Sequence, residues 1–272
     1  MQEQQGREWV AIVDFGSQYT QLIARVVREL GVYCEVVSCA RTVRQDEYLR
    51  GVVLSGSPRS VHDACAPSFD FSPYEGRVPV LGICYGAQLM AAKHGGAVSR
   101  SAAREYGRAR LSAVSAESLL TRGVAQDSQV WMSHGDTIVQ LGDGFVVTAS
   151  THSIPVAMFE KSEGKLYGVQ FHPEVSHTEV GRTVLKNFLM GICGCKCDWT
   201  PRGFVQSEVE SLRKRIGSDR VVLGLSGGVD SSVAALLLQR AIGDQLTCIF
   251  IDHGLLREGE YESVLASYRG MG

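Results

Sequence analysis

The sequence predicts an α/β protein with a doubly wound, mostly parallel sheet, followed by the beginning of a second α/β domain. Through residues 9–96, apolar segments with the length of buried strands alternate with segments of helical periodicity. This order is typical of a parallel sheet with helices on both faces. After a boundary at residues 194–203, which is rich in Cys, Gly, Asp and Pro, the same alternation starts again.

The first domain opens with an almost wholly apolar strand, Trp9 to Val13. Residues 18–31 carry an apolar stripe at helical spacing and end at Gly31, which predicts a helix. The pattern then predicts strands at 32–38, 49–58 and 77–84, a helix at 87–96, a run of strands through 107–171 and a closing helix at 178–193.

The second domain begins with a helical pattern at residues 204–217 and continues with a strand, a glycine-rich turn, a helix at 229–243 and a strand ending at residue 252. Because one crossover is too little to cover both faces of a parallel sheet, we expect the chain to be cut short at Gly272. The predicted organisation is a flexible N-terminus at 1–8, a first domain at 9–199 and an incomplete second domain at 200–272.

Composition and charge exclude several classes of protein. The chain has 272 residues, of which 27 are Lys or Arg and 29 are Asp or Glu, and its net charge is −2. This balance gives no support to a nucleic-acid or anionic-membrane partner. Neither a secretory leader nor an apolar run long enough for a membrane span is evident, so we expect a cytoplasmic protein.

The chain contains eight cysteines, and three of them alternate at Cys193, Cys195 and Cys197. In a cytoplasmic protein, cysteines are more often free, catalytic or metal-binding than disulfide-bonded. Alternate spacing is a poor match to the paired Cys-x-x-Cys knuckles of structural zinc. We therefore interpret this segment as a cysteine-rich linker rather than a metal site.

Cys84 lies in the segment VLGICYGAQ, where an apolar strand passes into a helix between Gly82 and Gly86. Nucleophiles on open parallel sheets lie at the carboxyl ends of strands, and a sharp strand-to-helix turn requires small neighbours. The N-terminus of a helix favours a thiolate and can also stabilise an oxyanion. The alternative is a buried structural cysteine in a turn that tolerates glycine.

A thiolate that performs acyl chemistry needs a base and a group that orients the base. His172 and Glu174 end the apolar strand of VQFHPEVSH, and residues two apart on an extended backbone share a face. Glu174 could hold one imidazole nitrogen while the other faces the sulfur. The alternative is a surface histidine beside a carboxylate. We expect His134, in MSHGD, to lie in a turn that lines the site.

A second glycine-rich turn, residues 226–232 (SGGVDSS), separates an apolar strand from a helix. Glycines let consecutive backbone N–H groups point at an anion, with the helix N-terminus behind them. It is not a Walker A loop, because no Gly-Lys-Ser/Thr closes it. The alternative is a tight turn before a helix that Asp230 or Ser231 caps.

The motifs GICYGAQ and HPE resemble those of the class I glutamine amidotransferases. DFGSQYTQLIARVVREL, VLSGSP, WMSHGD and GVQFHPEVSHT narrow the resemblance to the glutaminase domain of the GMP synthase family, over nearly all of Trp9 to Trp199. The resemblance implies a nucleophile, a base and its partner at Cys84, His172 and Glu174. It also implies an oxyanion hole and glutamine-binding residues at Gly56, Tyr85, Gln88, Ser133, His134, Gly135 and Asp136. Ser57 departs from the family's common Leu-Ser-Gly-Gly-Pro and adds a Cβ next to the oxyanion loop.

The second turn resembles the pyrophosphate loop of the ATP pyrophosphatases, which cleave ATP to AMP and pyrophosphate. The resemblance implies a nucleotide-binding domain in which Asp252, in IFIDHGLLR, flanks the nucleotide. It implies Mg²⁺ as well, with Asp230 as a guessed ligand. The implied ATP-binding residues are Ser226, Gly227, Gly228, Val229, Asp230, Ser231 and Ser232.

Together the two resemblances imply glutamine-dependent amination of xanthosine monophosphate (XMP) to GMP, with glutamine, XMP and ATP as substrates and no nucleic-acid or membrane partner. A homodimer is implied only for a full-length chain, and GMP formation is not expected from these 272 residues alone. Two alternatives are an amidotransferase serving another acceptor and a non-catalytic relative that senses glutamine or a nucleotide.

Overall fold

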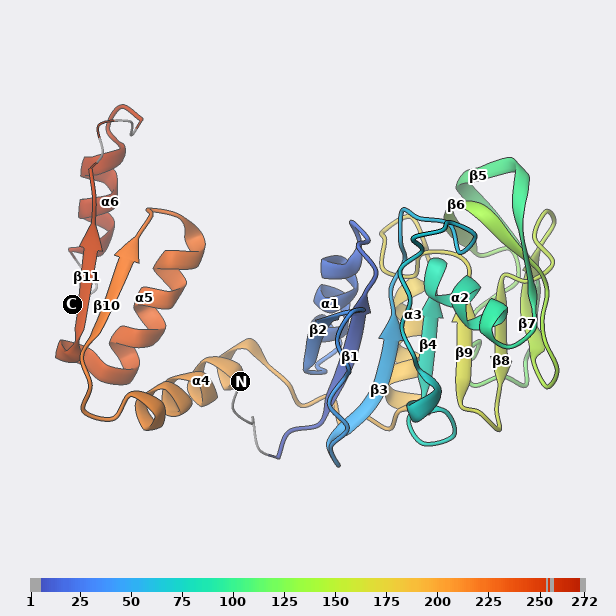
Figure 1. Ribbon diagram of the computed structural model, residues 1–272, viewed down its shortest axis with the longest axis horizontal. Coiled ribbons are helices and arrows are strands. Elements are labelled where there is room, and N and C mark those ends of the chain that lie inside the picture. The colour runs from blue at the N-terminus through green and yellow to red at the C-terminus, as the bar shows by residue number, and fades with distance from the viewer. Residues whose placement is uncertain (1–5, 253, 255–256, 270–272) are drawn as a thin grey trace. The chain divides into compact units, whose positions relative to one another are not determined.

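The computed structural model describes residues 6–252, 254 and 257–269 (Figure 1). The chain divides into two compact units, Met1–Asp198 and Trp199–Gly272. None of the helices in the described part is long and apolar enough to cross a membrane.

A mixed sheet forms the centre of the first unit, with nine strands over the described residues in the order β2-β1-β3-β4-β9-β8-β7-β5-β6. The pairings from β2 to β9 are parallel, whereas those from β9 to β6 are antiparallel. The α/β fold class is therefore confirmed, with an antiparallel half built from the strand-rich middle of the sequence. The strands are β1 (Trp9–Asp14), β2 (Cys34–Ser38), β3 (Leu49–Leu54), β4 (Val80–Ile83), β5 (Ala97–Val114), β6 (Gln129–Gln140), β7 (Val146–Thr151), β8 (Met158–Lys161) and β9 (Leu166–Val169).

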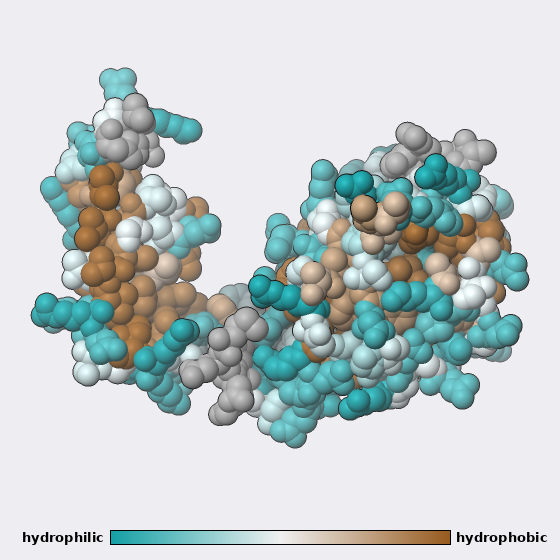
Figure 2. Space-filling view, viewed as in Figure 1, coloured by the Kyte–Doolittle hydropathy of each residue, from teal (hydrophilic) through white to brown (hydrophobic). Residues whose placement is uncertain are grey.

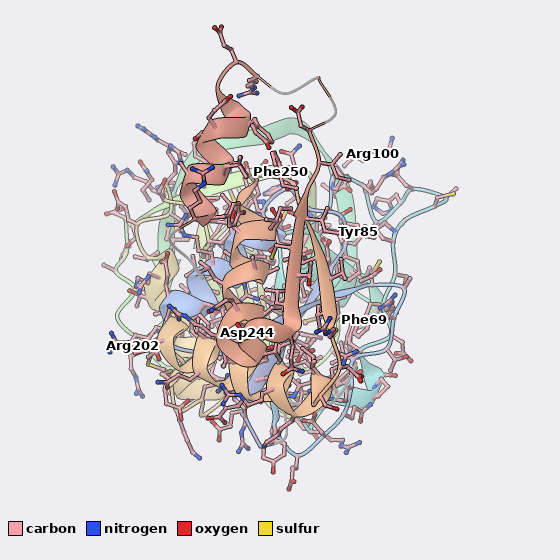
Figure 3. The ribbon with its side chains drawn as sticks, turned by 90° about the vertical axis from the view of Figure 1, so that its left-hand side faces the viewer. Phe69, Tyr85, Arg100, Arg202, Asp244 and Phe250 are labelled. Carbon is pink, nitrogen blue, oxygen red and sulfur yellow. The ribbon has the colours of Figure 1, made fainter. Side chains whose placement is uncertain are left out.

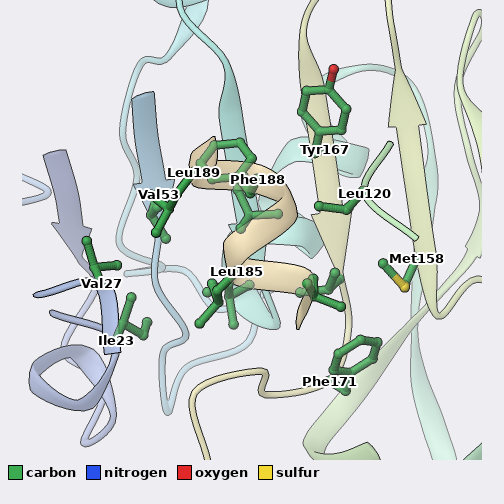
Figure 4. Close-up of a cluster of buried hydrophobic side chains, with 14 of the residues drawn as sticks. Ile23, Val27, Val53, Leu120, Met158, Tyr167, Phe171, Leu185, Phe188 and Leu189 are labelled. Atoms are coloured by element: carbon green, nitrogen blue, oxygen red, sulfur yellow. The ribbon is translucent and has the colours of Figure 1, made fainter. Parts of the chain in front are cut away.

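Helices cover both faces of the parallel half. On one face, Ile23 and Val27 of α1 (Thr20–Glu29) and Leu185 of α3 (Gly181–Lys186) share a buried cluster with β3 Val53 (Figure 4). On the other face, α2 (Tyr85–Lys93) and the short 3₁₀-helix η1 (Ser72–Tyr74) pack against the opposite side chains of β1 and β3. Full burial of each large apolar side chain contributes about 1.5–3 kcal/mol, so these two layers hold the strand ends in place.

The closing helix begins later than predicted and changes type along its length, although it ends within one residue of the predicted position. It begins at Gly181 rather than near residue 178, because the Gly181 N–H donates to Thr178 O at 3.1 Å in a preceding turn. After Lys186 it continues as a π-helix, η2 (Asn187–Ile192).

The cysteine segment that follows η2 does not form the linker that its composition predicted. Cys195 belongs to the buried core of the first unit, and Cys193 and Cys197 pack against that core. Among the described residues, no group of three or more His, Cys, Asp or Glu side chains could hold a metal ion.

The second unit contains α4 (Pro201–Ile216), β10 (Val221–Leu225), α5 (Val229–Ile242), η3 (Gly243–Gln245), β11 (Leu246–Phe250) and α6 (Glu260–Tyr268). β10 and β11 pair in parallel. α4 starts three residues earlier than predicted, because Thr200 caps it by accepting from the Gly203 N–H at 3.1 Å and Pro201 occupies its first turn. Phe250, at the end of β11, stacks on Tyr261 of α6 with ring centroids 5.9 Å apart (Figure 3).

Several large apolar side chains of the second unit face solvent. Val222 of β10 and Ile251, just after β11, are each 67% exposed, and Val229 at the start of α5 is 77% exposed. Figure 2 shows the corresponding apolar surface over this unit.

Candidate active site

Cys84 lies between β4 and α2, at the carboxyl end of the parallel half of the sheet. It is the N-cap of α2 and has φ 51° and ψ −105°, a conformation that non-glycine residues rarely adopt. The Cys84 N–H donates to Val169 O of β9 at 2.8 Å, which fixes the turn to the neighbouring strand. The first turn of α2 therefore begins directly beside the sulfur, where its free N–H groups favour negative charge.

The glycines on either side of this turn are required for packing. A Cβ on Gly82 would lie 2.6 Å from Ala87 N, and a Cβ on Gly86 would collide with the backbone carbonyl of Leu54. β4, α2 and β3 approach so closely here that no side chain fits between them.

Gly86→Ala is expected to destabilise the first unit by roughly 1–3 kcal/mol, because the Leu54 backbone cannot move without disturbing the sheet. Urea unfolding would measure this change in the free energy of unfolding. Gly191→Ala is the matched control, since a Cβ at Gly191 meets nothing within 4 Å. Equal stability of the two variants would contradict the packing argument.

His172 and Glu174 follow β9 and are almost fully buried, with exposed fractions of 3% and 4%. His172 Nδ1 donates to Glu174 Oε1 at 2.7 Å. The His172 backbone is also held, because its N–H donates to Trp131 O at 3.0 Å and its carbonyl accepts from Thr178 Oγ1 at 2.6 Å. With Nδ1 bound to Glu174, the other imidazole nitrogen is left to interact with the Cys84 side chain, whose sulfur lies 3.8 Å from Ser133 O.

The charges of these three groups support one another. Burial by itself lowers the pKa of the His172 imidazole, but the Cys84 thiolate and the Glu174 carboxylate outweigh it and raise that pKa to about 11. The arrangement therefore favours a positive charge on the His172 imidazole, which places a proton donor beside the Cys84 sulfur.

Cys84→Ala is expected to lower the pKa of His172. The variant removes the interaction of the sulfur with His172, while the lowering effect of burial stays. Nitrogen-15 NMR titration of the His172 ring would follow this pKa in both proteins. A His172 pKa that is unchanged or higher in the variant would contradict the ion pair.

A cavity of about 810 Å³ opens beside the sulfur. This volume is typical of small-molecule sites. Its lining is predominantly polar and includes most of the residues that the motifs predict for the site: Cys84, Tyr85, Gln88, Ser133, His134, Gly135, Asp136 and His172. Glu174 and Gly56 are adjacent to the cavity without lining it. Glu174 lies behind His172, and a Cβ added to Gly56 would lie 3.3 Å from His172 Cε1.

His134 lines the cavity, but residues 133–136 lie in a strand, so the predicted turn conformation is wrong. β6 runs from Gln129 to Gln140 without a break, because its pairing with β5 carries the strand through this segment. Gln88 of α2 donates from Nε2 to Asp136 O at 2.8 Å, which joins α2 to this strand.

Ser57, the departure from the family pattern, fits its position without backbone strain. Its φ is not among the positive values found for non-glycine residues in the described chain. Ser57 Oγ accepts from the Arg59 N–H at 3.2 Å and so stabilises the turn after β3.

The cavity lining also contains residues that no motif predicted, among them Ser17, Tyr19, Arg59 and Arg100. The Tyr19 ring lies edge-on to His172, with centroids 5.0 Å apart. Ser17, Tyr19 and Arg59 follow the carboxyl ends of β1 and β3, a position that could have identified them. Arg100, labelled in Figure 3, comes from β5 beside a register shift, and no sequence pattern indicated it.

The glycine-rich turn of the second unit lies between β10 and α5. Gly227 has φ 76°, and the N-cap of α5 is Gly228, so the predicted cap at Asp230 or Ser231 is wrong. The serine hydroxyls bind within the turn instead: Ser226 Oγ and Ser231 Oγ are 3.0 Å apart, and Ser232 Oγ donates to Gly228 O at 2.8 Å. Asp230 lies in the first helical turn.

Part of the segment expected beside the nucleotide can be placed. Asp252 follows β11 and accepts from the Gly254 N–H at 2.9 Å. His253, Leu255 and Leu256 lie outside the described residues.

Curated relatives match almost the whole chain. The glutamine-hydrolyzing GMP synthase of Cytophaga hutchinsonii is 54% identical over 265 residues, which are 97% of this chain and 52% of the relative. A glutamine-hydrolyzing GMP synthase of Bacteroides thetaiotaomicron is 52% identical over 266 residues, which are 98% of this chain and 52% of the relative. The chain thus spans about half the length of the curated relatives it matches.

Solved structures match the first unit. A candidate GMP synthase subunit from Thermoplasma acidophilum is 32% identical, with a TM-score of 0.60 over 70% of this chain and 95% of that one. A glutamine amidotransferase of Thermotoga maritima shares the fold at 20% identity, with a TM-score of 0.55 over 69% of this chain and 99% of that one.

Family models match both parts of the chain and confirm the resemblance that the motifs predicted. The model described as NAD synthase matches residues 203–265. The model described as Glutamine amidotransferase class-I matches residues 11–192, a range that contains the Cys84 turn and the His172–Glu174 pair. This chain belongs to the class I glutamine amidotransferase family.

Proposed function

We propose that the first unit hydrolyses glutamine to glutamate and ammonia, with Cys84 as nucleophile, His172 as acid and base, and Glu174 as the group that orients His172. The Glu174–His172 hydrogen bond and the electrostatic interaction of His172 with Cys84, beside a cavity large enough for an amino acid, carry this proposal.

The Cys84 thiolate attacks the side-chain amide carbon of glutamine, and the carbonyl oxygen becomes an oxyanion. The backbone N–H groups of Tyr85, at the start of α2, and Gly56, beside His172, are the proposed donors to that oxyanion. The His172 imidazolium gives its proton to the departing nitrogen, and ammonia leaves with the C–N bond pair. Neutral His172 then takes a proton from water, whose oxygen attacks the thioester carbon and releases glutamate and the Cys84 thiolate.

The cavity lining supplies groups for the rest of the substrate. Gln88 and the strand residues Ser133 to Asp136 form one wall. Arg59 and Arg100 contribute positive charges, and Arg100 lies 4.0 Å from the Asp63 carboxylate, which also lines the cavity. A free amino acid carries a carboxylate that such charges attract. We propose that this wall holds glutamine with its amide directed at Cys84.

The second unit is proposed to bind ATP at the turn that contains residues 226–232, with the α5 N-terminus directed at the phosphates. Mg²⁺ in nucleotide sites is commonly held by one or two carboxylates together with phosphate oxygens. Asp230 in the first turn of α5 fits that requirement and is its proposed protein ligand. When bound, Mg²⁺ would neutralise charge on the pyrophosphate.

For the longer protein that the relatives represent, we propose glutamine-dependent amination of XMP to GMP, with ATP cleaved to AMP and pyrophosphate. The names of the relatives and the pairing of an amidotransferase unit with a nucleotide-loop unit support this assignment. ATP is needed because the XMP carbonyl must be activated before ammonia can displace its oxygen.

The 272 residues on their own are expected to release glutamate from glutamine without forming GMP when XMP, ATP and Mg²⁺ are added. Glutamate release and GMP absorbance would be measured on the same sample. A diazoketone analogue of glutamine tests the first half directly, because it is expected to form one adduct, at Cys84. A folded chain that neither releases glutamate nor forms the adduct would refute the hydrolytic function and favour a sensing role. Formation of GMP would refute the prediction that these 272 residues cannot make it alone.

A further inference from the structure

Two thiols at the end of the π-helix η2 lie together at the edge of the sheet opposite the candidate active site. Cys193 and Cys195 flank Gly194 just after the helix ends. Two backbone hydrogen bonds cap the helix: the Cys193 N–H donates to Phe188 O at 2.8 Å, and the Cys195 N–H donates to Leu189 O at 2.9 Å. Gly194 has φ 66°, so the chain reverses direction between the two cysteines. The cap therefore holds both side chains against the same part of the core.

The two side chains contact each other and the amino-terminal end of the sheet. The Cys193 thiol interacts with the Cys195 sulfur and stabilises negative charge on it. A Cβ added to Gly51, near the start of β3, would lie 2.7 Å from Cys193 Sγ, so the glycine leaves the space that this sulfur occupies. Cys84, in contrast, follows the carboxyl end of β4, which is parallel to β3. The pair is therefore separate from the catalytic thiol.

Cys193 is the neighbour that most favours a thiolate at Cys195, and two charged residues beside the pair act in opposite directions. Arg50 Nη2 donates to Glu8 Oε1 at 2.8 Å, while Arg50 Nε is buried without a hydrogen-bond acceptor. The interaction with Cys193, with a smaller contribution from Arg50, lowers the pKa of Cys195 against the opposing effects of burial and Glu8. Burial and the Cys195 sulfur together raise the pKa of Cys193. One member of the pair is therefore suited to react as a nucleophile and the other to remain a thiol.

We propose that Cys193 and Cys195 form a peroxide-reactive dithiol that closes to a reversible disulfide. Hydrogen peroxide is the chemical class of oxidant that suits the site, because Cys195 keeps only 8% of its surface exposed and a larger oxidant would not reach it. The Cys195 thiolate attacks one peroxide oxygen, the O–O bond breaks, and hydroxide leaves. The resulting sulfenic acid is attacked by the Cys193 sulfur, which forms the S–S bond and releases water. A dithiol such as dithiothreitol restores both thiols.

The positions of the basic residues make a sharp test possible. Trypsin cleaves after Lys186 and Lys196, so the peptide 187–196 contains Cys193 and Cys195 but not Cys197. The native chain would be treated with hydrogen peroxide, the oxidant would be removed, and the chain would be unfolded in urea so that iodoacetamide reaches every remaining thiol before digestion and mass spectrometry. The expected peptide is two hydrogen atoms lighter than the reduced form and carries no alkyl group. Treatment with dithiothreitol before alkylation is expected to restore two alkyl groups.

Two variants complete the test. Cys197→Ser is expected to leave the disulfide unchanged, whereas Cys193→Ser is expected to abolish it and to leave Cys195 as a sulfenic acid that dimedone traps. The exposed Cys65 reports the dose of oxidant on another peptide. The proposal is overturned if the 187–196 peptide keeps two alkylated cysteines at a dose that oxidises Cys65, or if it is recovered cross-linked to the peptide that begins at Cys197. Because the readout is a mass, it is independent of the glutaminase proposal.

Discussion

Cys84→Ser is expected to lower the rate of glutamine hydrolysis by at least about 10³-fold, because a hydroxyl in place of the thiolate removes the group that forms the thioester. The loss is expected in kcat, since the cavity wall formed by Gln88 and β6 keeps its contacts. Glutamate release measured over a range of glutamine concentrations separates kcat from KM.

The control for this variant is Cys65→Ser, the same change at an exposed cysteine outside the cavity. It is expected to keep the full rate. If Cys84→Ser retained more than about a tenth of the activity, the sulfur would not be the nucleophile. Thermal unfolding of both variants shows whether the fold survives the substitution.

Glu174→Gln is expected to lower kcat by roughly 10²–10⁴-fold with little change in KM. The substitution keeps the size of the side chain but removes the negative charge 2.7 Å from His172 Nδ1. That charge helps to raise the pKa of His172, so the variant is also expected to have a lower pKa at this imidazole. Steady-state kinetics measure the first effect, and NMR titration of the histidine ring measures the second.

Glu179→Gln is the matched control, because Glu179 is an exposed carboxylate on the same segment, five positions further along the chain. It is expected to leave kcat and the His172 pKa unchanged. A normal kcat in Glu174→Gln would show that the orientation of His172 depends on its backbone contacts, to Trp131 O and Thr178 Oγ1, rather than on the carboxylate.

Local sequence predicted the features that depend on residues close together in the chain. Glycines on both sides of Cys84 predicted a sharp turn, and Cys84 has a positive φ. His172 and Glu174, two positions apart, were expected to share a face, and they are hydrogen-bonded. The two-stranded start of the second unit could also be predicted, because its strands and helix are each continuous in the sequence.

Other expectations failed where distant segments decide the conformation. The segment Ser133 to Asp136 resembles a turn by composition, but pairing with β5 extends it as part of β6. Cys195 resembles a linker residue, but the core of the first unit covers it. Arg100 reaches the cavity through the path of β5, which no local pattern reports.

By itself, the sequence determined which groups can do chemistry in this protein and the local backbone that presents each of them, because a turn or a two-residue pair is specified by its own side chains. Only the tertiary structure decided which groups meet: the sulfur after β4 and the imidazole after β9 are neighbours because those two strands pair in parallel. Strand order results from the burial of apolar side chains over the whole unit. The total apolar surface buried depends on all segments together, so no single segment specifies it.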